Sequence, residues 1–233
     1  MHTSGTAVIG AGRMGSVIAG QLPPSTKKII IDTDLEKACG LADAVDGIGS
    51  DSLKRAVEAD LIAVVLPAPA VNETILHLIG QAKPGTIILN MATAAVTDPT
   101  LQHKRPDISL IDAKIIGHAQ SISGGEPGIV VVNTRDEATL NTIRSRLPEF
   151  YAVVSGDPDV VAHINRIAST EGIRAAVRVR HQLAEYNIPN EWIDVAIRTV
   201  CAGTLKAFVE DDLGDFAREL VKEMQKRMVS ERC

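Results

Sequence analysis

The segment whose residue types and spacing most directly predict chemistry is Gly10-Ala11-Gly12-Arg13-Met14-Gly15. In a G-x-G-x-x-G pattern the first glycine permits a tight turn, the second lets the backbone approach a pyrophosphate, and the third lets a helix pack close to a strand. The flanking apolar residues predict a strand over 6–10 and a helix over 13–22. Free N–H groups at that helix's N-terminus would bind phosphate. The context favours dinucleotide binding over a glycine-rich turn that binds nothing.

Asp32 is the last residue of a second predicted strand, over residues 28–32. A carboxylate at this place can accept hydrogen bonds from the ribose hydroxyls of NAD and would repel a 2′-phosphate. Thr33 and Asp34 come next, and no arginine stands beside Asp32. NAD(H) is therefore favoured over NADP(H), although Lys27 and Lys28 could still bind a phosphate.

The composition excludes several classes of protein. The chain has 233 residues, 45% of them hydrophobic and 3% aromatic, so its core must be built of Ile, Val, Leu and Ala, as in a buried parallel sheet. A net charge of −5 argues against a nucleic-acid partner. No apolar run is long enough to span a membrane, and the N-terminus does not resemble a signal peptide. Three scattered cysteines (Cys39, Cys201 and Cys233) indicate free thiols, so we expect a cytoplasmic protein.

Strand and helix patterns alternate up to residue 156, and only helical patterns follow. We therefore predict an α/β fold: a doubly wound, mostly parallel Rossmann sheet over 1–156 and a smaller all-helical domain over 157–233. The helix that begins at Asp157-Pro158 carries apolar residues on more than one side. Those surfaces predict a homodimer through the helical domain; the alternative is that the helices only cover the sheet of their own chain.

Ligands of open α/β sheets lie beyond the carboxyl ends of the strands. Cofactor-binding candidates at those ends, besides residues 10–15 and Asp32, are Leu66, Pro67, Asn90 and Thr93, of which Asn90 and Thr93 could equally be turn residues. The polar segment 117–125, predicted to be a loop, would face a substrate through Ser121 and Ser123. In it His118 is the best candidate for a general acid, because the ordinary histidine pKa is near neutral.

Three further residues are candidates for catalysis or substrate binding. Lys114 could donate a proton or bind a carboxylate; the alternative is a strand residue that points to solvent. Glu171 could orient a cationic amine or imine, and Arg174 could hold a carboxylate. Their spacing equally suits an i,i+3 ion pair on a solvated helix face. No histidine or cysteine pattern suggests a metal site.

Residues 8–15, the strand end Leu66-Pro67, and residues 85–90 with Ala92-Thr93 resemble the pyrroline-5-carboxylate reductase and 6-phosphogluconate dehydrogenase-like superfamily. The resemblance covers about the first 135 residues, and implies a Rossmann domain with a helical dimerisation domain. The superfamily's 3-hydroxyacid dehydrogenases carry a catalytic lysine in the first interdomain helix, but residues 157–186 contain none. Pyrroline-5-carboxylate reductases carry a Ser/Thr-rich loop in the later helices, and Ala202-Gly203-Thr204 is the nearest fragment here.

The sequence thus predicts an NAD(P)-dependent oxidoreductase that transfers a hydride between nicotinamide and a small polar substrate. Because the interdomain lysine is missing, reduction of a C=N bond is slightly favoured over a 3-hydroxyacid or prephenate-type dehydrogenase acting on C=O. A non-enzymatic alternative is a dinucleotide-binding redox sensor or regulator.

Overall fold

The computed structural model describes residues 5–147 and 151–230, and the chain divides into two compact units, residues 1–166 and 167–233. The division lies within helix α7 (Asp159–Ala184), further along the chain than the boundary predicted after residue 156. The start of α7 belongs to the first unit because Val161 is buried and the side chain of Asn165 donates a hydrogen bond to the Ile115 carbonyl, at 2.8 Å.

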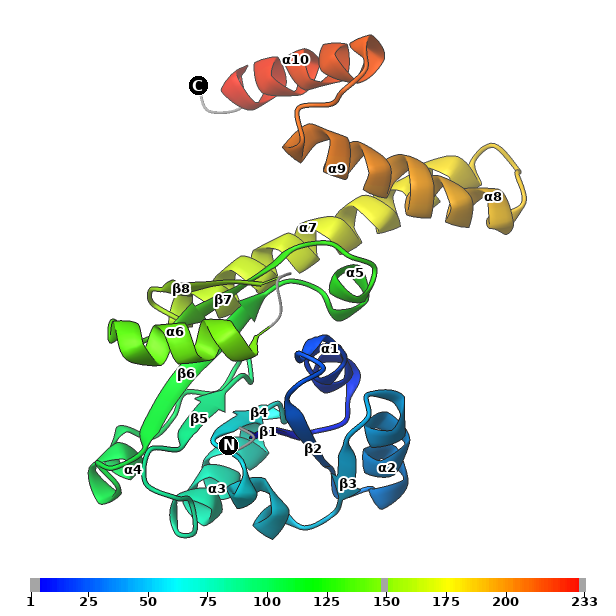
Figure 1. Ribbon diagram of the computed structural model, residues 1–233. Coiled ribbons are helices and arrows are strands. Elements are labelled where there is room, and N and C mark those ends of the chain that lie inside the picture. The colour runs from blue at the N-terminus through cyan, green and yellow to red at the C-terminus, as the bar shows by residue number, and fades with distance from the viewer. Residues whose placement is uncertain (1–4, 148–150, 231–233) are drawn as a thin grey trace. The chain divides into compact units, whose positions relative to one another are not determined.

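The first unit is built on a sheet of eight strands in the order β3-β2-β1-β4-β5-β6-β7-β8 (Figure 1). From β3 to β6 all neighbours are parallel, whereas β7 is antiparallel to β6. The predicted doubly wound, mostly parallel sheet is therefore confirmed. The strands are β1 (Gly5–Ile9), β2 (Lys27–Ile31), β3 (Ile48–Ser50), β4 (Leu61–Val64), β5 (Ile87–Asn90), β6 (Ser109–Ile116), β7 (Gly128–Val132) and β8 (Tyr151–Ser155).

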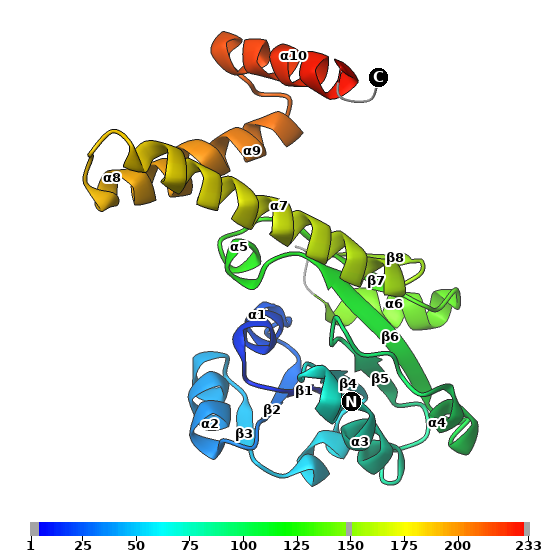
Figure 2. The ribbon, with the colours of Figure 1, turned by 180° about the vertical axis from the view of Figure 1, so that it is seen from behind.

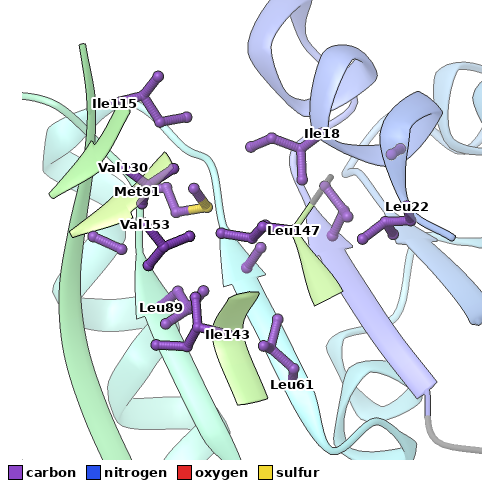
Figure 3. Packing of buried hydrophobic residues seen from close by; sticks show 14 of the residues in the cluster. Ile18, Leu22, Leu61, Leu89, Met91, Ile115, Val130, Ile143, Leu147 and Val153 are labelled. Atoms are coloured by element: carbon purple, nitrogen blue, oxygen red, sulfur yellow. The ribbon is translucent and has the colours of Figure 1, made fainter. Parts of the chain in front are cut away.

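Helices cover both faces of this sheet (Figures 1 and 2). One apolar cluster, shown in Figure 3, lies under α1 (Arg13–Gln21), α2 (Leu35–Ala44), α5 (Ala119–Ser123) and α6 (Glu137–Arg146). The cluster on the opposite face lies under the 3-10 helix η1 (Leu53–Glu58), α3 (Ala68–Ile79) and α4 (Pro99–Lys104). Aliphatic side chains fill both clusters, as the scarcity of aromatic residues predicts.

The two short helices α4 and α5 are absent from the sequence prediction. Helix α4 begins at an Asp-Pro pair, in which the Asp98 carboxylate accepts a hydrogen bond from the Thr100 N–H at 2.9 Å. Helix α5 lies within the segment predicted to be a loop, and its Ile122 is buried in the core. That apolar anchor, rather than helical periodicity, explains why five residues form a helix here.

The second unit consists of the rest of α7 followed by α8 (Asn190–Val195), the π-helical segment η2 (Ala196–Cys201), α9 (Ala202–Val209) and α10 (Asp215–Ser230). Among residues 167–227, Ile193 is the only side chain that is buried. This unit therefore has very little core of its own, in contrast to the first unit.

Two glycines determine how closely α1 approaches β1. Gly10 has a φ of +108°, a conformation that side chains disfavour, and a Cβ at this position would lie 2.3 Å from the Val65 carbonyl oxygen. A Cβ on Gly15 would lie 1.8 Å from the Gly10 carbonyl oxygen. The helix N-terminus can therefore reach the carboxyl edge of the sheet only because both residues lack a side chain.

Gly15→Ala should lower the free energy of unfolding by about 1–3 kcal/mol or more, because the added methyl group collides with backbone. The matched control is Gly20→Ala in the same helix, where an added Cβ meets nothing within 4 Å. That variant should be neutral or more stable by about 0.5–1 kcal/mol. Chemical denaturation measures both values, and equal stabilities for the two variants would contradict this packing.

Candidate functional site

The fingerprint loop presents an open helix N-terminus at the carboxyl edge of the sheet. Gly12 is the N-cap of α1, and no side chain caps the helix there. The first N–H groups of a helix have no intrahelical partner and carry the positive end of the helix dipole. A Cβ on Gly12 would meet nothing within 4 Å, so the space in front of these groups is open. Residues 10–15 therefore fit a pyrophosphate, as predicted from their spacing.

Asp32 lies beside this loop and holds it. One carboxylate oxygen accepts a hydrogen bond from the Ala11 N–H at 2.8 Å, and the other accepts one from the Asp34 N–H at 3.0 Å. An ionised carboxylate has about four acceptor positions, so two remain for ribose hydroxyls. The acid at the end of β2 thus has two roles available: it fixes the fingerprint loop and can bind the ribose.

A cavity of about 340 Å³ connects the fingerprint loop with His118. It is lined by Gly12, Arg13, Met14, Gly15, Val65, Gly117, His118 and Ala119. His118 is exposed and is the N-cap of α5, which lies beside α1 in Figures 1 and 2. The structure therefore brings the predicted general acid and the predicted phosphate site to one cavity. Ser121 and Ser123, the predicted substrate residues, are exposed on α5 and do not line it.

The remaining predicted cofactor residues also follow strands at this edge. Leu66 is half-buried, and its Cδ2 atom would lie 3.3 Å from a Cβ on Gly10. Pro67 is exposed at the N-cap of α3, and Thr93 is exposed in the segment after β5. Their positions are compatible with contact to a dinucleotide that crosses the strand ends.

Asn90 and Lys114 belong instead to a buried polar cluster at the end of β5. The Asn90 amide donates hydrogen bonds to the Asp112 carboxylate at 2.6 Å, the Ala95 carbonyl at 2.9 Å and the Thr97 hydroxyl at 3.3 Å. Its own oxygen accepts one from the Ala92 N–H at 3.2 Å. Both polar atoms of this side chain are bonded within the protein and the residue is 1% exposed, so the arrangement favours a structural role for Asn90.

The Lys114 ammonium is also enclosed. It donates to the Ala95 carbonyl at 2.5 Å and the Asn90 carbonyl at 3.3 Å, and lies 3.5 Å from the Asp112 carboxylate. Burial lowers the pKa of Lys114, and the nearby Asp112 charge opposes that shift. With a side chain 1% exposed, Lys114 neither points to solvent nor reaches a substrate in this arrangement. This cluster was not predicted from the sequence, although the polar residues Asn90, Asp112 and Lys114 within apolar strands were a signal for it.

Glu171 and Arg174 lie in the second unit and form an exposed ion pair with each other on α7. This is the alternative that their i,i+3 spacing allowed. Their predicted roles in catalysis and substrate binding stay predictions.

A larger cavity, of about 460 Å³, has a different chemical character. Its lining includes Asp98, Asp112, Asp157 and Asp159, together with the neutral or weakly basic residues Asn133 and His103. Carboxylates would repel a pyrophosphate, so size alone does not mark the dinucleotide site.

Within the part of the chain that the structure describes, no helix has both the length and the apolar content needed to cross a membrane.

Comparisons with known proteins agree with this assignment. Residues 6–140 match the family model described as the NAD-binding domain of 6-phosphogluconate dehydrogenase. No curated protein matches the chain in sequence.

Solved structures share the fold at low sequence identity. A pyrroline-5-carboxylate reductase from Coxiella burnetii is 12% identical with a TM-score of 0.72, over 99% of this chain and 91% of that one. A 3-hydroxyisobutyrate dehydrogenase from Mycobacterium tuberculosis is 18% identical with a TM-score of 0.59, over 80% and 67% of the two chains. An imine reductase variant from Myxococcus stipitatus, in complex with NAD+, is 16% identical with a TM-score of 0.56, over 91% and 78%.

The resemblance stated from residues 8–15 and the later strand ends is thereby confirmed. Since the family model covers more than half of the chain, the protein belongs to the family of NAD(P)-binding oxidoreductases that shares the NAD-binding domain of 6-phosphogluconate dehydrogenase.

Proposed function

We propose that this protein is an NAD-dependent reductase that delivers a hydride to the C=N bond of a small polar imine. The observation that carries the proposal is the single cavity shared by the open N-terminus of α1 and His118. Such a cavity can bind a dinucleotide and offer a proton donor on the same side.

The chain's own residues would divide the work as follows. The N–H groups at the start of α1 bind the pyrophosphate, and Asp32 accepts hydrogen bonds from the adenosine ribose. When bound, the nicotinamide supplies the hydride. His118 donates a proton to the nitrogen of the reduced substrate or holds that nitrogen's proton in place.

The choice of C=N over C=O rests on the lysines. Residues 157–186 contain no lysine. Lys114, the other candidate, is enclosed in a buried cluster and does not line the cavity. An imine is often protonated already and needs less help from an acid than a carbonyl. The similar structures include an imine reductase and a pyrroline-5-carboxylate reductase, but also a 3-hydroxyisobutyrate dehydrogenase, so a 3-hydroxyacid or prephenate-type dehydrogenase is the second candidate.

A regulatory protein that binds the dinucleotide without turnover is the candidate outside enzymology. The exposed position of His118, with no second ionisable group beside it in the cavity lining except Arg13, is the observation that favours it. Turnover with any imine or hydroxyacid would exclude it.

We also propose a cytoplasmic homodimer that associates through the helical unit. The supporting observation is a set of large apolar side chains that are more than half exposed: Ile167, Ile173, Val177, Tyr186, Trp192, Val195, Val200, Leu205, Phe208, Val209, Phe216 and Met224. Apolar area of this kind, in a unit with little core, is typical of a subunit interface. Cys39 and Cys201 are free thiols, which suits a reducing compartment.

Asp32→Asn should change the cofactor preference. Removing the charge weakens the bonds to the ribose and ends the repulsion of a 2′-phosphate, so the ratio of NADPH affinity to NADH affinity should rise about tenfold or more. Calorimetric titration of both dinucleotides measures the ratio. The matched control is Asp60→Asn. Asp60 also accepts a backbone hydrogen bond, from the Gly5 N–H, but it lies at the amino ends of the strands, away from the carboxyl ends where Asp32 lies. A ratio unchanged in Asp32→Asn would contradict the assigned role of Asp32.

His118→Ala should lower kcat for imine reduction about 100-fold or more while the Kd for NADH stays within about twofold. Oxidation of NADH in the presence of cyclic imines, and reduction of NAD in the presence of 3-hydroxyacids, measure the two candidate reactions. His77→Ala serves as the control, because His77 is exposed and lies outside the cavity lining. Turnover of hydroxyacids alone would replace the C=N proposal, and turnover of neither class would support the regulator.

Light scattering of the purified chain should give a particle of twice the 24.8 kDa chain mass. Phe208→Glu, at a side chain 57% exposed, should shift the protein toward the monomer mass. Leu76→Glu, which alters a similarly exposed apolar residue in the first unit, should leave the dimer intact. A monomeric wild-type chain would refute the dimer.

A further inference from the structure

The segment that follows β5 is fastened at both ends to the buried cluster of Asn90, Asp112 and Lys114. At its start, the Ala92 N–H donates to the Asn90 side-chain oxygen at 3.2 Å. At its end, the Ala95 carbonyl accepts from Lys114 and Asn90, at 2.5 and 2.9 Å. Further on, the Thr97 hydroxyl donates to the Asp112 carboxylate at 2.8 Å.

Only the tip of this segment is free. The Ala95 N–H donates to the Ala92 carbonyl at 3.3 Å, which closes residues 92–95 into a turn. Thr93 and Ala94 are exposed, whereas Ala92 and Ala95 are 7% exposed. The cluster therefore presents one short turn at the carboxyl end of β5.

Burying the charged and polar groups of this cluster costs free energy that apolar side chains would not cost. Asn90 and Asp112 are directly paired in the register of β5 and β6, and Lys114 follows on the same side of β6. Their exposed fractions are only 1%, 6% and 1%, respectively. Well-packed apolar side chains at such places are often at least as stabilising as a buried ion pair. Complete hydrogen bonding of the cluster instead specifies one conformation of the backbone that it holds.

The position of the turn connects it to the cofactor, and this step rests on the proposed function. With the adenosine ribose at Asp32 after β2 and the pyrophosphate at α1 after β1, the rest of the dinucleotide must extend over β4 and β5. The turn over residues 92–95 is at the end of β5, so it would meet the nicotinamide half and not the adenosine half.

We propose that Lys114 is a positioning residue: through the carbonyls of Asn90 and Ala95 it holds the 92–95 turn in the place where the nicotinamide half of the dinucleotide binds. Its ammonium acts on the backbone and does not contact the ligand. In a variant without the Lys114 ammonium, the 92–95 turn would no longer be held in one conformation.

The test compares a whole dinucleotide with its adenosine half. Lys114→Met should raise the Kd for NADH about tenfold, while the Kd for ADP-ribose, which lacks nicotinamide, should change less than about twofold. The fluorescence change of NADH on binding should also diminish, because the nicotinamide is less firmly held. Lys83→Met is the control: the Lys83 ammonium also donates to a backbone carbonyl, that of Glu58 at 2.9 Å, but it precedes β5 and lies at the amino ends of the strands. It should leave both Kd values unchanged.

Every outcome decides between the claims. If the wild-type chain binds neither ligand, the proposed function fails. If it binds both and Lys114→Met weakens both equally, or neither, the positioning role fails while the proposed function stands. If Lys114→Met does not fold, Thr97→Val removes one hydroxyl at a half-buried site, and with it the bond to Asp112 and the longer bond from Asn90. It should weaken NADH binding selectively by about threefold, and equal effects on NADH and ADP-ribose would overturn the proposal.

Discussion

The contact between Gly15 and the Gly10 carbonyl is the constraint on which the rest of the site depends. No side chain fits between them, so α1 can begin directly at the carboxyl edge of β1. Asp32 then closes the loop from the side by accepting the Ala11 N–H. The two interactions leave the helix N-terminus open toward Gly12 and place it in one cavity with His118. Cofactor recognition thus follows from backbone geometry before any long side chain is considered.

The two halves of the sheet edge are stabilised in different ways. On the β1–β2 side the fixed elements are glycines and one carboxylate, which is half-buried and keeps acceptor capacity. On the β5–β6 side a fully bonded cluster of Asn90, Asp112 and Lys114 holds a turn by its carbonyls. The first arrangement leaves polar groups available for a ligand, whereas the second uses its polar groups internally. A dinucleotide that lies across both halves would contact an anion-binding helix N-terminus on the β1–β2 side and a turn of fixed conformation on the β5–β6 side.

Local patterns were sufficient to predict the strand–turn–helix unit around Gly10 and the acid at Asp32, because each depends on residues close together in the sequence. The same holds for the alternation of strands and helices up to residue 156. Helices α4 and α5 were missed because they are only six and five residues long and depend on tertiary anchors such as Ile122. The enclosure of Lys114 depends on the pairing of Asn90 with Asp112, which is non-local. Lysine is rarely buried, so its type alone points to solvent or catalysis.

A crystal structure of the chain grown with NADH tests the central claim most directly. The account predicts the pyrophosphate at the N-terminus of α1 in front of Gly12, the adenosine ribose at Asp32, and the nicotinamide on the His118 side of the cavity beside the 92–95 turn. Nucleotide bound instead in the acidic cavity that Asp98, Asp157 and Asp159 line would contradict it. So would a nicotinamide directed away from both His118 and that turn.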